Sequence, residues 1–192
     1  MTRDLAERRG VETEVYGAAE DSQLLAEAAA EAIEPGWTVL DCGTGSGHVG
    51  GAVADAGDVR VIASDLNPHA CRRAQDRGLE AVRADLLAPF RADAFDAVLF
   101  NPPYLPTDPE NEWNDWMEVA LSGGESGREV IDPFLDSVGR VLAPDGIVLL
   151  LVSSLTGFED VLEYAEKRGF EANVVNEESF PFETLSVVKL RR

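Results

Sequence analysis

Short apolar runs alternate with amphipathic stretches along most of this chain. A continuous run of Val, Leu and Ile is typical of a strand that is covered on both faces of a parallel sheet. Apolar residues three and four positions apart predict the helices between these strands. The predicted strands are 37–41, 59–65, 79–83, 95–100, 147–152, 170–175 and 185–190. The predicted helices are one that Asp21 or Ser22 caps and Pro35-Gly36 ends, one from about 48, 68–77, 128–142 and 158–168.

Strands that alternate with helices predict one α/β domain over residues 1–192, with a parallel sheet and helices on both of its faces. The last two strands are an exception, because only a short turn around 178–183 joins them and a parallel crossover needs more chain. We therefore expect a seven-stranded, mostly parallel sheet that ends in a C-terminal antiparallel hairpin. Pro144-Asp145-Gly146 predicts a turn before the fifth strand. Residues 1–14 are expected to form a flexible arm.

The strand 95–100 ends at a polar tip, Asn101-Pro102-Pro103-Tyr104. Proline has no backbone N–H and a fixed φ, so the strand cannot continue through the tip. The tip presents a carboxamide, backbone carbonyls and an aromatic ring, which together can hold a planar nitrogen group. The side-chain oxygen of Asn101 and the carbonyl of Pro102 would accept two N–H bonds, while Tyr104 covers the flat face. The alternative is a plain proline turn at the end of a strand.

A glycine-rich turn follows the first strand. Gly43, Gly45 and Gly47 come directly after Asp41, and such glycines let the backbone approach a ligand closely. The spacing fits the dinucleotide fingerprint only in part, because the last glycine of that fingerprint stands one position later. At the ends of the next two strands, Asp65 suits a ribose diol and Asp85 could accept from an adenine amino group.

Together these motifs resemble the class I S-adenosylmethionine-dependent methyltransferases. The tip at 101–104 resembles the members that methylate planar nitrogens. Within these, the chain is similar to the short HemK-type branch, which methylates the glutamine of the Gly-Gly-Gln motif in archaeal and eukaryotic translation termination (release) factors. The stretches 15–22, 123–132 and 183–190 resemble further motifs of that branch, and the likeness extends over nearly the whole chain from Val11. Ala18 departs from the proline that is usual in the family.

The resemblance implies a Rossmann-like class I methyltransferase fold, S-adenosyl-L-methionine as the cofactor, and no metal. The catalytic residues that it implies are Asn101, Pro102, Pro103 and Tyr104. The cofactor-binding residues that it implies are Ser22, Asp41, Gly43, Gly45, Gly47, Asp65, Asp85, Leu86 and Asn101. It also implies a heterodimer with a small zinc-binding activator subunit, which would cover the edge strand of the sheet near Val82–Leu87, where Ala81, Val82, Leu86 and Leu87 offer apolar side chains. The alternative is an edge that its own charges protect.

The chain is strongly acidic, because 16 Lys and Arg residues face 36 Asp and Glu residues and the net charge is -20. Without a basic patch to follow phosphates, the chain is not expected to bind nucleic acid directly. Scattered acidic residues with only two lysines are typical of a protein from a halophilic, salt-accumulating cell; an ordinary acidic protein is the alternative. No apolar run is long enough to span a membrane and no signal peptide is evident, so we expect a cytoplasmic protein with no membrane contact.

The sequence is also compatible with functions other than glutamine methylation. Such a tip could also present an exocyclic amine of a nucleobase in RNA or DNA, or a protein lysine. The acidic composition and the lack of a target-recognition domain count against a nucleobase. A catalytically silent binding subunit is disfavoured because both motifs are intact. The stretch 105–127 has little regular pattern and is expected to frame the substrate entrance. Trp113 and Trp116 are expected to hold this loop in place; the alternative is that they pack on a substrate peptide.

Overall fold

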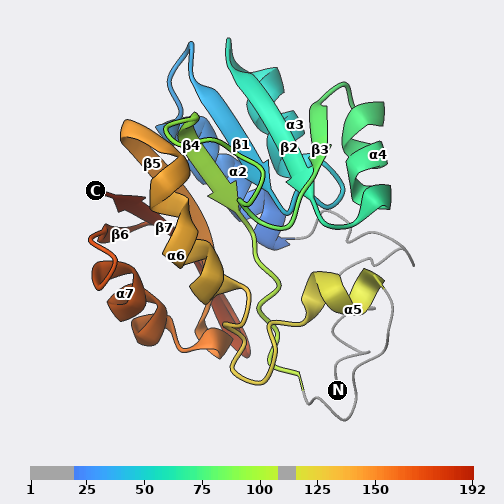
Figure 1. Cartoon of the computed structure of the whole chain (residues 1–192). Coiled ribbons are helices and arrows are strands. Elements are labelled where there is room, and N and C mark those ends of the chain that lie inside the picture. The colour runs from blue at the N-terminus through green and yellow to red at the C-terminus, as the bar shows by residue number, and fades with distance from the viewer. Residues whose placement is uncertain (1–19, 108–115) are drawn as a thin grey trace.

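A seven-stranded sheet runs through the described part of the molecule (Figure 1). The computed structural model describes residues 20–107 and 116–192, so the expected arm at 1–14, Ala18 and Trp113 lie outside the described residues. The strands are β1 Thr38–Cys42, β2 Arg60–Asp65, β3 Glu80–Arg83, β4 Phe95–Phe100, β5 Leu142–Ser153, β6 Glu171–Phe180 and β7 Glu183–Arg191. Their order is β3-β2-β1-β4-β5-β7-β6. Strands β1 to β5 are parallel and β7 is antiparallel to β5 and β6, which confirms the predicted sheet and its hairpin.

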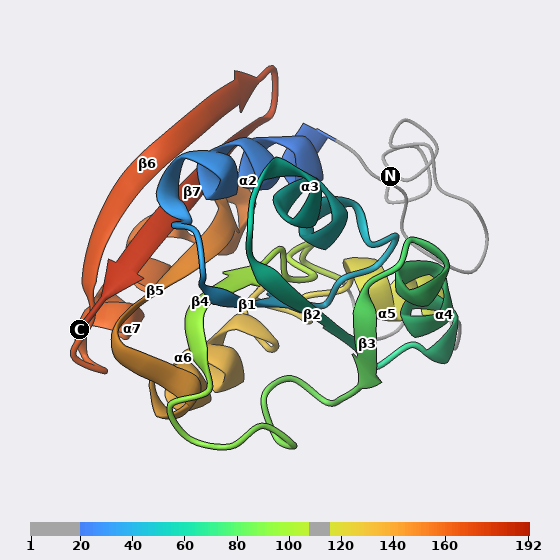
Figure 2. The same ribbon diagram turned by 90° about the horizontal axis from the view of Figure 1, so that it is seen from above.

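Helices cover both faces of this sheet. They are α2 Glu20–Ala32, α3 His48–Ala56, α4 Pro68–Asp76, α5 Trp116–Leu121, α6 Ile131–Val141 and α7 Phe158–Glu166. Viewed from above, α2 and α3 lie on one face and α6 and α7 on the other (Figure 2). Helix α4 packs beside β2 and β3 at one end of the sheet. None of the helices in the described ranges is both long and apolar enough to cross a membrane.

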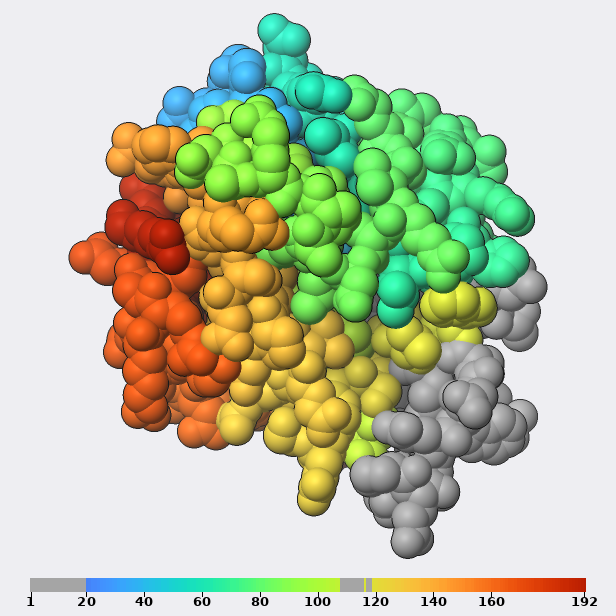
Figure 3. All heavy atoms as spheres, in the orientation of Figure 1, coloured from blue at the N-terminus to red at the C-terminus, as the bar shows by residue number. Residues whose placement is uncertain are grey.

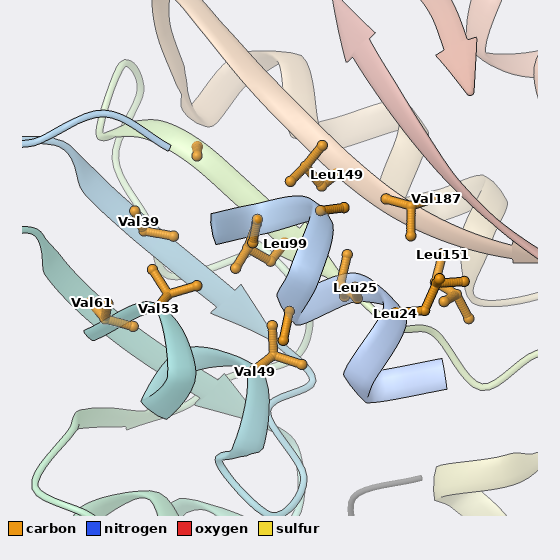
Figure 4. Close-up of a cluster of buried hydrophobic side chains, with 14 of the residues drawn as sticks. Leu24, Leu25, Val39, Val49, Val53, Val61, Leu99, Leu149, Leu151 and Val187 are labelled. Atoms are coloured by element: carbon orange, nitrogen blue, oxygen red, sulfur yellow. The ribbon is translucent and has the colours of Figure 1, made fainter. Parts of the chain in front are cut away.

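The core consists of two apolar layers, one on each face of the sheet. On the α2 and α3 side, side chains from these helices pack onto the strands (Figure 4). On the other side, the rings of Phe100 and Phe134 lie with their centroids 4.4 Å apart. Residues 97–100 of β4 are buried from both sides, with at most 1% exposure, so the continuous apolar run was read correctly. The residues labelled in Figure 4 belong to the layer on the α2 and α3 side; they are Leu24, Leu25, Val39, Val49, Val53, Val61, Leu99, Leu149, Leu151 and Val187.

The start of α2 differs from the sequence prediction. Asp21 and Ser22 lie inside the helix rather than before it, so neither is its cap as predicted. The Asp21 carboxylate accepts the N–H of Ser22 at 2.7 Å. An acidic side chain in the first turn is favourable because the N–H groups there have no partner within the helix.

Three loops also differ. A helix, α5, lies inside the stretch 105–127 that was expected to be irregular. The predicted turn at 144–146 is a kink within β5, where Asp145 has a φ of 65° and the register with β4 shifts. The hairpin turn between β6 and β7 is shorter than predicted, because pairing continues to Phe180 opposite Glu183. Acidic side chains on the outer strand point to solvent and do not prevent this pairing.

Strand β3 is at the edge of the sheet, as expected. Val82 is 40% exposed there, and Leu66, just after the end of β2, is 42% exposed. Leu87 was expected to add an apolar side chain to this edge, and that is wrong: it is only 1% exposed because it packs into the core below β4.

Candidate active site

Two motifs that are far apart in the sequence meet near the middle of the sheet. Strands β1 and β4 are neighbours there, with β2 and β3 on one side and β5 to β7 on the other. In such sheets, ligands bind outside the carboxyl ends of the strands at the point where the strand order reverses. Cys42 pairs with Phe100 in the register of the two strands, so Gly43 and Asn101 emerge side by side. A cavity of about 460 Å³ opens above them.

Nearly all of the predicted site residues line this cavity. They are Ser22, Asp41, Gly43, Gly45, Asp65, Asp85, Leu86, Asn101, Pro102, Pro103 and Tyr104. Gly47 is not among the lining residues. A Cβ on Gly47 would lie 3.0 Å from Cδ of Arg77 and 3.2 Å from Cα of Ala74, so this glycine lets α3 begin close to α4.

Asp41 stabilises the glycine turn through hydrogen bonds. Its Oδ2 accepts bonds from Thr44 Oγ1 at 2.6 Å and from the N–H of Gly50 at 2.9 Å. The side chain is buried, and burial raises the pKa of the carboxyl from 3.8 to about 6. Gly43 follows with a φ of 66°, and a Cβ there would lie 3.2 Å from the ring of Phe100. Glycine at this place therefore brings the turn directly onto β4.

Asp65 ties the end of β2 to the same turn. Its Oδ2 accepts the N–H of Gly45 at 2.9 Å, and its Oδ1 accepts the N–H of Asn67 at 2.8 Å. Burial raises the pKa of Asp65 as well. Each carboxylate oxygen has about two acceptor sites, so the group retains capacity for hydroxyl donors in the cavity.

The Asn101 carboxamide lies at the end of β4 in a defined orientation. Its Nδ2 donates to Ser22 Oγ at 3.4 Å. Its Oδ1 is buried and has no hydrogen-bond partner among the described residues. A buried acceptor without a donor is costly, so this oxygen is suited to an incoming N–H group. Next to it, Tyr104 is 4% exposed, and its hydroxyl donates to Asp21 Oδ2 at 3.3 Å.

Leu86 and α5 form further walls of the cavity. Leu86 has a φ of 45°, a region that residues other than glycine rarely adopt. Asp85 beside it is exposed. Trp116 and Val119 of α5 line the far end, and the backbone N–H of Leu105 bonds to the carbonyl of Leu121 at 3.0 Å. In Figure 3 the yellow atoms of α5 and the residues after it lie against the green atoms of the β3 to β4 region.

Several lining residues were missed from the sequence, namely Asp21, Thr44, Ser64, Asn67, Val119 and Glu129. The order Asn67-Pro68 was a usable signal for one of them, because Asn before an N-terminal proline is typical of a helix cap. Its Oδ1 does accept the N–H of His69 at 2.9 Å. Within residues 20–107 and 116–192, no three His, Cys, Asp or Glu side chains gather so that they could hold a metal ion.

Comparison with known proteins gives a consistent family. A family model described as a methyltransferase domain matches residues 39–124. A Methanocaldococcus jannaschii protein that carries the name of a protein N5-glutamine methyltransferase is 32% identical over 93% of this chain and 92% of its own length. The human methyltransferase HEMK2 is 31% identical over 96% of this chain and 92% of its own length. The chain belongs to the protein N5-glutamine methyltransferase family.

Solved structures agree with this family. A chain of the solved structure described as "E. cuniculi Mtq2-Trm112 complex" superposes with a TM-score of 0.77 at 31% identity, covering 93% of this chain and 98% of that one. As a protein N5-glutamine methyltransferase, this chain has the class I methyltransferase fold that the resemblance implied. The family resemblance drawn from the motifs is thereby confirmed.

Proposed function

We propose that this protein N5-glutamine methyltransferase methylates the side-chain amide nitrogen of the glutamine in the Gly-Gly-Gln motif of a translation termination factor. The observation that carries the proposal is the buried, unpaired Oδ1 of Asn101, which lies beside the glycine turn. The E. cuniculi complex is described as responsible for methylation of the eRF1 termination factor. Termination takes place in the cytoplasm, and we assign the activity to that compartment.

The cavity fits S-adenosyl-L-methionine as the methyl donor. Gly43 lines the cavity, and its lack of a side chain lets the turn pack directly on Phe100 at the floor of the site. Asp65 would accept the ribose hydroxyls and Asp85 the adenine amino group, with Leu86 packed against the base. The remaining residues that would hold the cofactor are Ser22, Asp41, Gly45 and Asn101. When bound, this cofactor would supply a methyl carbon on a positively charged sulfur; the electron pair of the broken carbon–sulfur bond would stay on sulfur, and the methylated nitrogen would release one of its two protons to water.

The tip of β4 would prepare the substrate nitrogen for attack. An amide nitrogen is a weak nucleophile because its lone pair is conjugated with the carbonyl. Asn101 Oδ1 and the carbonyl of Pro102 accept its two N–H bonds and favour the positive charge that develops on it. Pro103 keeps the tip rigid, and Tyr104 packs on the amide plane. Alignment of the nitrogen with the methyl carbon accounts for much of the acceleration.

Radiolabelled methyl transfer tests the proposal. The wild-type termination factor should be labelled, and its variant with alanine in place of the Gly-Gly-Gln glutamine should not. Equal labelling of both proteins would refute the assignment of the glutamine. DNA and RNA oligonucleotides in parallel reactions test the nucleobase alternative, which the net charge of -20 disfavours.

We further propose that a small zinc-binding activator subunit pairs with the β3 edge, near Val82–Leu87. An exposed edge strand offers backbone groups to which another chain can add. Of the three charges that could protect this edge, two are engaged within the chain: Glu80 pairs with Arg60 at 2.8 Å, and Arg83 Nε donates to the Leu66 carbonyl at 3.0 Å. The third, Asp85, is exposed. Val82 on the strand and Leu66, just after the end of β2, are both exposed apolar side chains.

A matched pair of variants tests this interface. Val82→Arg should prevent co-purification with the activator, because it places a charge on the proposed contact. Val174→Arg should leave co-purification intact, since Val174 is equally exposed, at 46%, but lies on β6 at the opposite edge. An enzyme that is equally soluble, monomeric and active without the activator would contradict the proposal.

A further inference from the structure

We propose that Asp21 is a positioning residue that determines which way the Asn101 carboxamide faces. The inference rests on the proposed function, in which Asn101 Oδ1 must accept a bond from the substrate amide. A carboxamide has an acceptor and a donor end of nearly the same shape. Turned around, Asn101 would present its NH2 group to the substrate NH2 group, and the bond that holds the substrate would be lost.

A chain of hydrogen bonds links Asp21 to Asn101. The Ser22 hydroxyl lies 3.4 Å from Asp21 Oδ1 and donates to it. The same hydroxyl oxygen accepts from Asn101 Nδ2 at 3.4 Å. On its other oxygen, Asp21 accepts from the Tyr104 hydroxyl at 3.3 Å. Asp21 is 2% exposed and Ser22 is 7% exposed, so solvent has little access to the chain.

The direction of this chain follows from the chemistry of its first member. A carboxylate only accepts hydrogen bonds, so the Ser22 hydroxyl must use its proton toward Asp21. The lone pairs of Ser22 Oγ are then directed at Asn101, which can donate a hydrogen bond to them only from its NH2 end. The Oδ1 end is thereby left buried and without a partner among the described residues, on a residue that lines the cavity. The N–H of Ser22, 2.7 Å from Asp21 Oδ1, fixes that carboxylate oxygen in place.

Asp21, at the start of α2, also orients both polar side chains of the tip, Asn101 and Tyr104. The same carboxylate holds Tyr104, which would cover the amide plane, and through Ser22 it holds the amide acceptor. Asn101 and Tyr104 are therefore oriented by one group on a different element. This arrangement explains why a buried carboxylate stands in the first turn of a helix whose other buried residues, apart from Ser22, are apolar.

Two substitutions at Asp21 separate its acceptor role from its charge. Asp21→Asn removes the charge but keeps one oxygen acceptor. The N–H of Ser22 would bond to that oxygen and keep it facing Ser22. Asp21→Leu is of similar length and removes both. With cofactor at saturation, we expect turnover to fall by about tenfold or more in Asp21→Leu and by less than about threefold in Asp21→Asn. Cofactor affinity, measured by calorimetry, identifies any separate effect on binding.

Ser22→Ala provides a second variant that does not depend on how Asp21→Leu folds. It removes the middle member of the chain but leaves the bond from Tyr104 to Asp21, so turnover should fall by no more than in Asp21→Leu. Because Ser22 acts on Asn101 through the same path as Asp21, the double variant should be no slower than Asp21→Leu. Equal losses in Asp21→Asn and Asp21→Leu, or additive losses in the double variant, would overturn the proposal.

A spectroscopic measurement tests the orientation without any methyl acceptor. The side-chain NH2 signal of Asn101, assigned by its absence in Asn101→Ala, should exchange slowly with solvent in the wild-type protein. Its exchange should accelerate in Ser22→Ala and Asp21→Leu but not in Asp21→Asn. Unchanged exchange in all three would refute the positioning role. This result is independent of the substrate, so it distinguishes failure of the inference from failure of the proposed function.

Discussion

Two adjacent glycines in α3 are expected to respond in opposite directions to the same substitution. A Cβ on Gly50 would lie 2.8 Å from Asp41 Oδ2, 3.2 Å from Asp41 Cβ and 3.3 Å from Leu79 Cδ1. A Cβ on Gly51 would have nothing within 4 Å. Gly50 therefore lets α3 pack closely on Asp41 and Leu79, whereas Gly51 has no such role.

The expected magnitudes follow from these contacts. Alanine is a better helix former than glycine by about 0.8–1 kcal/mol, and this gain applies to both positions. At Gly50 the methyl group would also press on Asp41, which is buried and held by two hydrogen bonds, and overpacking of this kind costs about 1–3 kcal/mol. The gain in propensity cancels between the variants, so their free energies of unfolding should differ by about 1–3 kcal/mol.

Thermal unfolding followed by circular dichroism measures this difference. For a chain of this size, 1 kcal/mol corresponds to roughly 2–4 °C in Tm. Gly51→Ala should therefore unfold at a higher temperature than the wild-type protein, and Gly50→Ala at a temperature roughly 2–12 °C below Gly51→Ala. Equal shifts in the two variants would refute the reasoning, because they would mean that Asp41 moves aside without cost.

Four further predictions concern the site and the charge. Asn101→Ala should reduce turnover on the order of 10²-fold with little change in cofactor affinity, which calorimetry on the same variant checks. Asp65→Ala removes the acceptor for the N–H groups of Gly45 and Asn67 as well as for the ribose, so cofactor binding should weaken by about 1–3 kcal/mol; unaltered affinity would move the ribose site elsewhere. The folded-state pKa of Asp41, about 6, is above its ordinary value of 3.8, so its favourable contribution is complete below pH 3.8 and is lost as the pH rises through 6. Relative to Asp41→Asn, the wild-type protein should thus lose up to about 3 kcal/mol of unfolding free energy across that window, and parallel pH profiles would contradict the raised pKa. At a net charge of -20, salt that shortens the Debye length from about 10 Å at 0.1 M to about 3 Å at 1 M should raise the Tm, and a flat or falling Tm in KCl would count against adaptation to salt.

The parts of the site that were predictable from sequence depend on local chain stiffness and on strand order. The apolar run 97–100 followed by two prolines allows little except a buried strand with a rigid end. Aspartates and glycines after parallel strands must gather at one edge of the sheet, so Gly43 and Asp65 could be placed together before any coordinates were known.

The parts that could not be predicted depend on side-chain contacts between distant elements. Asp and Ser are favoured both before a helix and in its first turn, so the sequence could not show that Asp21 faces Tyr104. The six-residue helix α5 is too short to produce a clear periodic pattern. Gly47 matched a ligand-binding turn in sequence, but its packing against α4 depends on where that helix lies.

The register between β1 and β4 fixes the distance between the glycine turn and the tip of β4. Gly43 of the glycine turn and Asn101 of the β4 tip each directly follow a paired position, Cys42 opposite Phe100, and both strands are buried on both faces. A slip of one residue would move Asn101 by about 3.3 Å and turn Phe100 to the other face. In the proposed function, this register would set the distance between the substrate nitrogen and the methyl carbon, so a slip would misalign them. Catalytic alignment should persist on heating until the central strands themselves separate, so loss of activity and loss of the sheet should share one temperature.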